Sequence, residues 1–147
     1  MLVVKKSRIK EAGKGLFTTS RIRKGDVIVE YKGERITWKQ ALKRYKGREE
    51  ELLYIFEINE DNCIDAHAFP DALAAYANDA NGTKHLGGKK HSLKNNCEYD
   101  VIKKKPYIVA TKDIGPNSEI FVDYGDEYWE AIVESLEKEK KRPKQRG

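Results

Sequence analysis

Short stretches in which apolar residues alternate with polar ones, or in which β-branched and aromatic residues cluster, recur along most of the chain. Such stretches are typical of strands in small sheets, and turns at Gly13, Gly15 and Gly25 separate the first of them. The pattern predicts strands at residues 2–6, 26–32, 52–58, 63–66, 98–102, 106–112 and 119–124. The chain is therefore expected to be mainly β.

Three segments have helical patterns instead. Thr37 and Gln40 have the spacing of a capping box, which predicts a helix from residue 38 that ends by Gly47. Pro70 can start a second short helix. Asp126 can cap a third helix over residues 127–142. This third helix carries an apolar stripe made of Trp129, Ile132, Val133 and Leu136.

The remaining long segment, residues 79–96, is rich in Gly, Asn, Lys and Ser and has no period, so we expect an exposed loop there. The 147 residues suffice for one domain, whereas two halves would be too small to bury adequate cores. Many short strands, few short helices and no internal repeat favour a mostly-β α+β domain.

Composition excludes several protein classes. Hydrophobic residues make up 39% of the chain and charged residues 36%, so the chain is polar but can still pack a core. With only two cysteines, Cys63 and Cys97, the chain cannot have a disulfide framework. The sequence also lacks the CxxC and HxxxH pairs that would indicate a zinc site. Because no apolar run has the length of a membrane span or the position of a signal-peptide core, we expect a soluble intracellular protein.

The charge is unevenly distributed along the chain. The net charge of +5 would ordinarily favour nucleic-acid binding, but residues 137–147 alone hold six Lys/Arg and two Glu. Residues 49–65 contain seven acidic residues and no Lys or Arg, whereas residues 84–105 contain seven Lys and two acidic residues. An acidic strip of this kind favours a basic partner.

Four separated segments carry the strongest functional signal. They are EAGKGLFTT, VIVEYKGE, LYIFEI with CIDA, and YAND followed through NNCEY by EIFVDYG. Together, in this order and spacing, they resemble the SET domain of protein lysine methyltransferases over about residues 3–129. The resemblance implies a SET-domain fold of short β-sheets with few short helices and a knot-like C-terminal core. It also implies S-adenosyl-L-methionine as the cofactor.

The resemblance assigns cofactor contacts to the segment that contains Ala12, Lys14 and Gly15. Its glycines would let the cofactor approach the backbone, and Lys14 could meet the cofactor's carboxylate. A hairpin turn with a solvated lysine is the alternative. Asn78 occupies the asparagine position of the family's asparagine–histidine motif. Asp79 replaces the histidine, and it could keep a main-chain contact with the adenine or cap a turn instead.

Two tyrosines are the catalytic candidates that the resemblance supplies. Tyr54 lies where a family tyrosine touches both the cofactor and the lysine channel, although strand alternation would place Tyr54 and Phe56 on one face as core residues. Tyr124 matches the tyrosine of the final motif, where the target amine meets the methyl group. A structural role in the knot-like core is the alternative for Tyr124. Tyr31 resembles the tyrosine of the family's YxG motif and is a secondary candidate.

No cysteine follows Gly125, so we expect the zinc-binding segment that follows many SET domains to be absent, and we expect no metal. The helix that contains Trp129 is expected to serve as a lid over the adenine and the peptide groove. Packing of Trp129 against the sheet is the alternative. The SET domain with this lid helix is expected to span residues 1–136, and residues 137–147 are expected to form a disordered basic tail.

The predicted function is that of an S-adenosylmethionine-dependent protein-lysine N-methyltransferase acting on a histone tail or a similar basic protein segment. The methyl group would pass in line to a deprotonated amine in a tyrosine-lined channel, where desolvation lowers the lysine pKa from near 10.4. One alternative is a catalytically silent SET fold that binds basic peptides, which Asp79 motivates. Another is a basic nucleic-acid-binding domain. The tail could add a weak contact with a polyanion, and a nuclear location would apply in a eukaryotic host.

Overall fold

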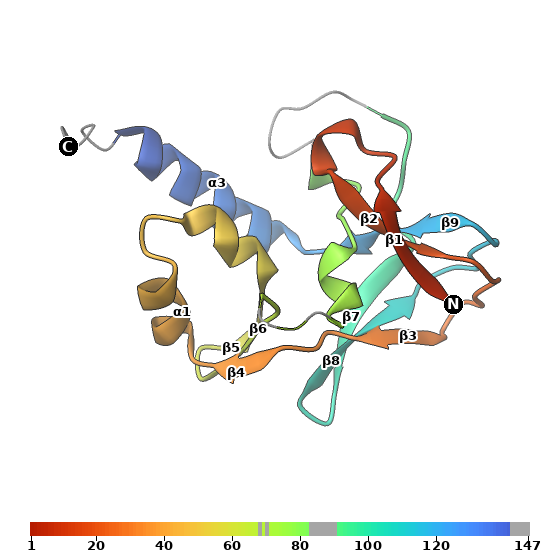
Figure 1. Cartoon of the computed structure of the whole chain (residues 1–147), viewed down its shortest axis with the longest axis horizontal. Helices are drawn as coiled ribbons and strands as arrows, with labels where there is room; N and C mark the ends of the chain where they lie inside the picture. The colour runs from red at the N-terminus through yellow and green to blue at the C-terminus, as the bar shows by residue number, and fades with distance from the viewer. Residues whose placement is uncertain (68, 70, 83–90, 142–147) are drawn as a thin grey trace.

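The computed structural model describes residues 1–67, 69, 71–82 and 91–141, and its strands form three small sheets (Figure 1). The first sheet is antiparallel, in the order β1 (Leu2–Lys6), β2 (Lys14–Thr18) and β9 (Ser118–Ile120). The second has the order β10 (Val122–Asp123), β7 (Cys97–Ile102), β8 (Lys105–Ala110) and β3 (Val27–Glu30). In this sheet only β10 and β7 are parallel. The third sheet places β4 (Glu34–Ile36) and β5 (Ile55–Asn59) on either side of β6 (Asn62–Asp65).

Helical segments connect and cover these sheets. The α-helices are α1 (Trp38–Arg44) and α3 (Asp126–Lys141), and the 3-10 helices are η1 (Lys10–Ala12), η2 (Glu49–Tyr54) and η3 (Leu73–Tyr76). The predicted capping box is confirmed, because the Gln40 N–H donates to Thr37 Oγ1 at 3.1 Å and the Thr37 N–H donates to Gln40 Oε1 at 2.9 Å.

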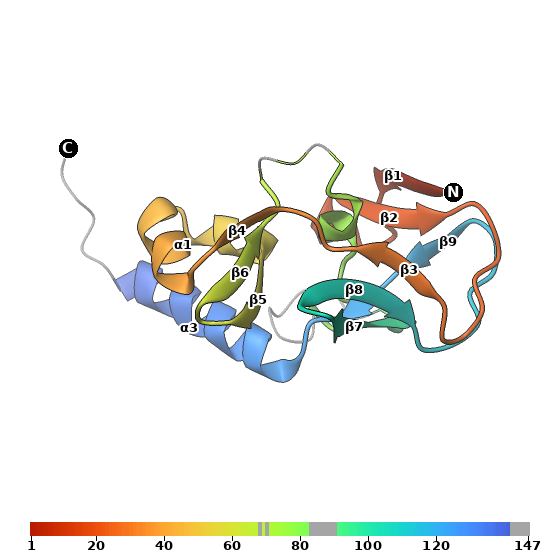
Figure 2. The same cartoon turned by 90° about the horizontal axis from the view of Figure 1, so that it is seen from below.

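The three sheets lie in two halves of the molecule. The first two sheets form one half, and the third sheet forms the other together with α1 and η2 (Figure 1). Helix α3 starts beside β10 and runs back along the half that holds the third sheet, past η2, in both views (Figures 1 and 2). The first turns of α3 therefore lie at the junction between the two halves (Figure 1).

The main core joins the sheets through aliphatic side chains that are at most 2% exposed: Leu16, Ile64, Ile108, Ile120 and Val122. A second cluster packs α1 and η2 onto the third sheet and includes Ala41, Tyr45, Leu52 and Ile55. Burial of these side chains provides the main stabilisation of the fold, at roughly 1.5–3 kcal/mol for each large one.

Residues 118–124 bond to both ends of the 79–96 segment, and the knot-like core that the resemblance implies stays a prediction. On one side the Val122 N–H donates to the Asn78 carbonyl at 2.9 Å. On the other side the Phe121 carbonyl accepts from the Asn96 and Cys97 N–H groups, each at 3.0 Å. The predicted long loop itself is described only at its ends, because residues 83–90 lie outside the described residues.

Two predicted strands differ from the structure. Residues 52–54 belong to η2 and not to a strand, because Leu52 is buried in the cluster that packs η2 against α1. The apolar run 119–124 is divided at Phe121 between β9 and β10, because its two halves pair with different sheets. The fold class is nevertheless the predicted mostly-β α+β class with few short helices.

The helix predicted over residues 127–142 is present as α3, which starts at Asp126 and ends at Lys141. Residues 137–141 of the expected tail are therefore helical. Residues 142–147 lie outside the described residues, so the division of the chain at residue 136 stays a prediction.

Candidate active site

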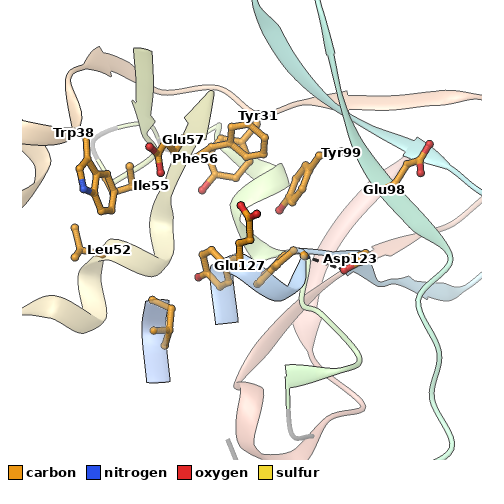
Figure 3. A pocket seen from close by; sticks show the side chains of 14 residues that line it. Tyr31, Trp38, Leu52, Ile55, Phe56, Glu57, Glu98, Tyr99, Asp123 and Glu127 are labelled. Carbon is orange, nitrogen blue, oxygen red and sulfur yellow. Dashed lines mark hydrogen bonds between the residues drawn. The ribbon is translucent and has the colours of Figure 1, made fainter. Parts of the chain in front are cut away.

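A cavity of about 620 Å³ lies between α3, β5 and the ends of β7 and β10 (Figure 3). Five tyrosine and phenylalanine residues line it, namely Tyr31, Phe56, Tyr99, Tyr124 and Tyr128. The remaining lining consists of four acidic residues, Gly125 and an apolar group made of Trp38, Leu52, Ile55 and Ile132. The volume is within the range of sites that bind small molecules or side chains.

The aromatic rings form a continuous wall across elements that are distant in sequence. Ring centroids are 5.4 Å apart for Tyr31 and Phe56, and 4.7 Å apart for Phe56 and Tyr99. The wall continues from Tyr99 to Tyr124 at 6.0 Å and from Tyr124 to Tyr128 at 4.9 Å. Edge-to-face and offset contacts at these distances are favourable and hold each ring in place.

The buried tyrosine hydroxyls of this wall are neutral. Burial raises the pKa of Tyr31, Tyr99, Tyr124 and Tyr128 well above the usual value. The Tyr124 hydroxyl donates to the Ala77 carbonyl, and the Tyr31 hydroxyl donates to the Tyr54 carbonyl at 2.9 Å. Because each of these two protons is already donated, the oxygen lone pairs remain available to accept a hydrogen bond from a bound amine.

Asp79 connects the Tyr124 segment to α3. Its carboxylate is 4% exposed, and Oδ2 accepts from the Tyr124 N–H at 3.0 Å and from the Trp129 indole N–H at 2.7 Å. Oδ1 accepts from the Asn81 N–H and from Asn95 Nδ2, each at 2.8 Å. The side chain is therefore fully used within the protein, and any contact of Asp79 with a cofactor would come from its main chain.

The other predicted cofactor residues lie next to this cluster. Asn78 Nδ2 donates to the Lys14 carbonyl at 3.0 Å, which holds the start of β2 against the Asn78 segment. Ala12 ends η1 and is half-buried, while the Lys14 side chain is exposed. Gly15 lies inside β2 and not in a turn, and a Cβ there would be 2.3 Å from Glu119 Oε2. Close packing against buried Glu119 thus explains this glycine.

Trp129 is a packing residue in this structure. It is 6% exposed, and its ring stacks on Tyr124 with centroids 5.7 Å apart. A Cβ on Gly82 would lie 3.1 Å from the indole, so the opposite chain segment also packs closely against it. Trp129 thereby fixes the start of α3 against Tyr124, and its role over an adenine stays a prediction.

Tyr54 adjoins the aromatic wall without lining the cavity. It ends η2, its side chain is 42% exposed, and it does not belong to the cavity lining. The expectation that Tyr54 and Phe56 share one strand face is wrong, because β5 begins only at Ile55. Tyr54 contributes to the site through its carbonyl, which holds Tyr31.

Sequence reasoning missed Tyr99 and left Tyr31 as secondary, and it expected Tyr128 only as part of the aromatic surface of the lid helix. Alternation along β7 places Tyr99 on the same face as Cys97, which is 1% exposed, so the pattern contained a signal that Tyr99 points inward. No local pattern relates Tyr128 to Tyr31, because these two residues line one cavity only in the folded chain.

A second polar network braces the third sheet near the cavity. Asp65 is 2% exposed and accepts from Arg44 at 2.8 Å, from the Tyr45 hydroxyl at 2.5 Å and from the His67 N–H at 3.0 Å. Burial opposes its charge, but these bonds outweigh burial and hold the pKa of Asp65 at about 2. The ring nitrogen Nε2 of His67 lies 2.5 Å from Oε2 of Glu51 in η2.

The two thiols are packing residues. Burial raises the pKa of Cys63 to about 11 and that of Cys97 to about 12, so both are inert thiols at neutral pH. Over the described ranges, no cluster of His, Cys, Asp and Glu is arranged to hold a metal ion. No helix in those ranges is long and apolar enough to cross a membrane.

Comparisons with known proteins agree with this architecture. Residues 13–125 match the family model of the SET domain. The chain is 32% identical over 124 residues to the histone-lysine N-methyltransferase ASHH1 of Arabidopsis thaliana, which covers 80% of this chain and 23% of that protein. It is 29% identical over 128 residues to the N-lysine methyltransferase KMT5A-A of Danio rerio, covering 80% of this chain and 34% of the relative.

Solved structures give the same result. The structure of ctPRC2 in an autoinhibited conformation bound to S-adenosylmethionine has a TM-score of 0.68 and 26% identity, and the match covers 95% of this chain and 17% of the ctPRC2 chain. The structure of a humanized mutant of the Chaetomium thermophilum Polycomb Repressive Complex 2 bound to the inhibitor GSK126 has a TM-score of 0.66 and 26% identity. That match covers 86% of this chain and 15% of the chain in the complex. The chain thus spans between 15% and 34% of the length of these four proteins. The match over residues 13–125 and the shared fold show that this chain belongs to the SET-domain family.

Proposed function

We propose that the protein is an S-adenosylmethionine-dependent protein-lysine N-methyltransferase. The observation that carries this proposal is the wall of neutral aromatic rings around the Tyr124 hydroxyl. The relatives named as lysine methyltransferases support it, although the chain covers 23% and 34% of two of them. A histone tail or a similar basic segment is the proposed substrate, and the nucleus is the proposed location in a eukaryotic host.

The aromatic wall suits the chemistry of a lysine nucleophile. Only a neutral amine can accept a methyl group, and deprotonating a lysine at neutral pH costs roughly 4 kcal/mol for a pKa near 10.4. Aromatic walls disfavour the charged ammonium by desolvation and so lower the lysine pKa. Since the Tyr124 proton is donated to Ala77, we assign Tyr124 the role of orienting the amine rather than of accepting its proton.

The residues on the other side of Tyr124 fit the proposed cofactor. Gly13 has a φ of 70° and open space where a Cβ would point, so a ligand can approach this turn closely. The exposed Lys14 ammonium beside it can pair with the cofactor's carboxylate, and Ala12 and Asn78 flank the same turn. When bound, the cofactor supplies a methyl group on a positively charged sulfonium.

Labelling tests the proposal directly. The protein is incubated with methyl-labelled S-adenosylmethionine and core histones, and the wild type is compared with Tyr124→Phe. We expect label on histone lysines and a loss of at least about tenfold in the variant, because the orienting hydroxyl is removed. Tyr107→Phe is the matched control, since Tyr107 is half-buried on β8 and outside the cavity.

Thermal unfolding of both variants separates a loss of chemistry from a loss of folding. If no basic protein accepts label, the enzyme proposal is overturned in favour of a SET fold that binds basic peptides. Equal labelling by wild type and Tyr124→Phe would remove Tyr124 from the proposed site while leaving the activity in place.

We propose a weak polyanion contact for the basic segment 137–147, which carries a local charge of +4. A chain truncated after Leu136 should lose salt-dependent binding to DNA or heparin. If such binding survives truncation, the contact belongs to the folded body, and the nucleic-acid-binding alternative gains support.

A further inference from the structure

The cavity is larger than a single lysine side chain requires. The five heavy atoms of that side chain fill about 150 Å³ at roughly 30 Å³ for each water-sized group. The cavity holds about 620 Å³, so most of its volume remains for other parts of a ligand. If the proposed function is correct, those parts are the residues that flank the target lysine.

The exposed lining of the cavity is uniformly acidic. Glu57, Glu98, Asp123 and Glu127 line it, and no Lys or Arg does, although the chain as a whole has 29 Lys/Arg and 24 Asp/Glu. All four side chains are exposed, and none forms an ion pair with any described lysine or arginine. Their charges are available to a ligand, and they complement a basic one.

One end of the cavity is apolar. Trp38, Leu52 and Ile55 gather there, away from Tyr31 and Tyr99 (Figure 3), and Ile132 of α3 also lines the cavity. Leu52 and Ile55 belong to the buried cluster that packs α1 and η2 onto the third sheet, and Trp38 packs against that cluster. This apolar end is therefore a preformed surface supported by core packing, which can bind a bulky side chain without reorganising.

We propose that the cavity selects substrates by a second side chain. The occupant is an extended basic peptide whose lysine enters between Tyr31 and Tyr124. A bulky apolar residue of the same peptide occupies the end formed by Trp38, Leu52 and Ile55. Side chains two or four residues apart in an extended peptide point to the same side, so the apolar residue lies at an even offset from the lysine. Arginine or lysine at other positions pairs with the exposed carboxylates.

Peptide binding tests the apolar end without requiring catalysis. Fluorescent peptides with one central lysine, two arginines and otherwise Gly and Ser are measured by anisotropy, with leucine placed at each position within four residues of the lysine. Burying a leucine contributes roughly 1.5–3 kcal/mol, so one even offset should bind at least about tenfold tighter than the others. No preference, or a preference confined to odd offsets, would overturn the proposal.

Variants connect the preference to named residues. Trp38→Ala and Ile132→Ala should each remove most of the leucine preference, whereas Leu42→Ala should not, because Leu42 lies on α1 but is 47% exposed and outside the cavity. Glu127→Gln should weaken binding of the arginine peptides, whereas Glu130→Gln on the same helix should leave it unchanged. Far-UV circular dichroism checks that each variant is folded, and Ile132→Ala decides the question if Trp38→Ala unfolds.

The two proposals fail in different ways. A leucine preference in a protein that labels no substrate would support this inference and overturn the methyltransferase assignment. Labelling of all peptides at similar rates, together with equal binding, would support the methyltransferase assignment and overturn this inference.

Discussion

The residue that departs most from the family pattern is also the one with the most internal bonds. Asp79 stands where the resemblance predicts histidine, and four donors converge on its two oxygens. A carboxylate can accept from all four, whereas a neutral imidazole has a single acceptor nitrogen. The aspartate therefore matches its neighbours Asn95 and Trp129, and it ties α3 to the backbone of Tyr124.

Replacing this carboxylate should destabilise the fold. In Asp79→Asn, one oxygen becomes an NH₂ donor facing other donors, so we expect a loss of about 2–4 kcal/mol in the free energy of unfolding. Asp79→His should not recover it. Urea denaturation measures both, and Asp61→Asn serves as an exposed control with an expected change below about 0.5 kcal/mol. A change in Asp79→Asn as small as that of the control would contradict the bonding described for Asp79.

The candidate site was only partly predictable at this scale. Tyr124 and the Asn78–Asp79 pair could be placed because each lies in a short motif with a recognisable neighbourhood. Tyr99 and Tyr128 could not be assigned to the cavity from the sequence, because the cavity forms only where β5, β7, β10 and α3 come together. The alternation around Tyr54 was misleading, because burial of Leu52 in a different cluster draws the residues before Ile55 into a 3-10 helix.

Among the elements, the third sheet depends on an ion network around the buried carboxylate of Asp65. Arg44 of α1 bridges Asp65 of β6 and Glu34 of β4, both at 2.8 Å. His67 extends the network to Glu51 of η2. Because η2 and β5 supply the apolar end of the cavity, this network supports the shape of the site without lining it.

The low pKa of Asp65 predicts a pH dependence of stability. The pKa is held at about 2, below its ordinary value of 3.8, so the stabilisation is complete above about pH 4 and is lost as the pH falls toward 2. The shift corresponds to about 2 kcal/mol. Asp65→Asn should remove this part of the pH dependence and should be less stable than wild type at pH 7. Urea titrations from about pH 2 to pH 6 measure both effects, and parallel curves for the two proteins would contradict them.

The elements could be predicted where local chemistry determined them. The capping box at Thr37 and Gln40 placed α1, and the interval between the predicted strands 52–58 and 63–66 placed the turn between β5 and β6. The division of residues 119–124 was not predictable, because the break at Phe121 comes from pairing with sheets on either side. Local alternation describes a strand but does not show which partner it has.

For the whole molecule, the net charge of +5 is opposite in sign to the charge of the side chains that line the candidate site. Among the acidic residues of the strip at 49–65, only Glu57 lines the cavity. Asp65 is buried, and Glu51 pairs with His67. Glu98, Asp123 and Glu127 come from other parts of the chain. The acidic character of the cavity therefore arises from the fold rather than from one sequence segment.

This arrangement predicts that salt weakens substrate recognition. Raising the salt concentration from about 0.1 M to about 1 M shortens the Debye length from about 10 Å to about 3 Å. We expect the KM for an arginine-containing peptide to rise about three- to tenfold, as screening removes a few exposed ion pairs, with kcat nearly unchanged. Steady-state kinetics measure this effect, with a serine-for-arginine peptide as control. An equal rise in KM for both peptides would show that the carboxylates do not recognise charge.

The position of residues 118–124 between the ends of the 79–96 segment has a consequence for the order of folding. Residues 118–124 can form these contacts only when both flanking segments are present. Glu119 in this segment also accepts a hydrogen bond from Ser7, near the start of the chain. Contacts between residues so far apart in sequence slow folding. On the ribosome, the first sheet stays incomplete until late in synthesis, because β2 lacks its partner β9 until residues 118–120 have been made. The site around Tyr124 therefore assembles in the last step, and fragments that end before this tyrosine expose unpaired strand edges to aggregation.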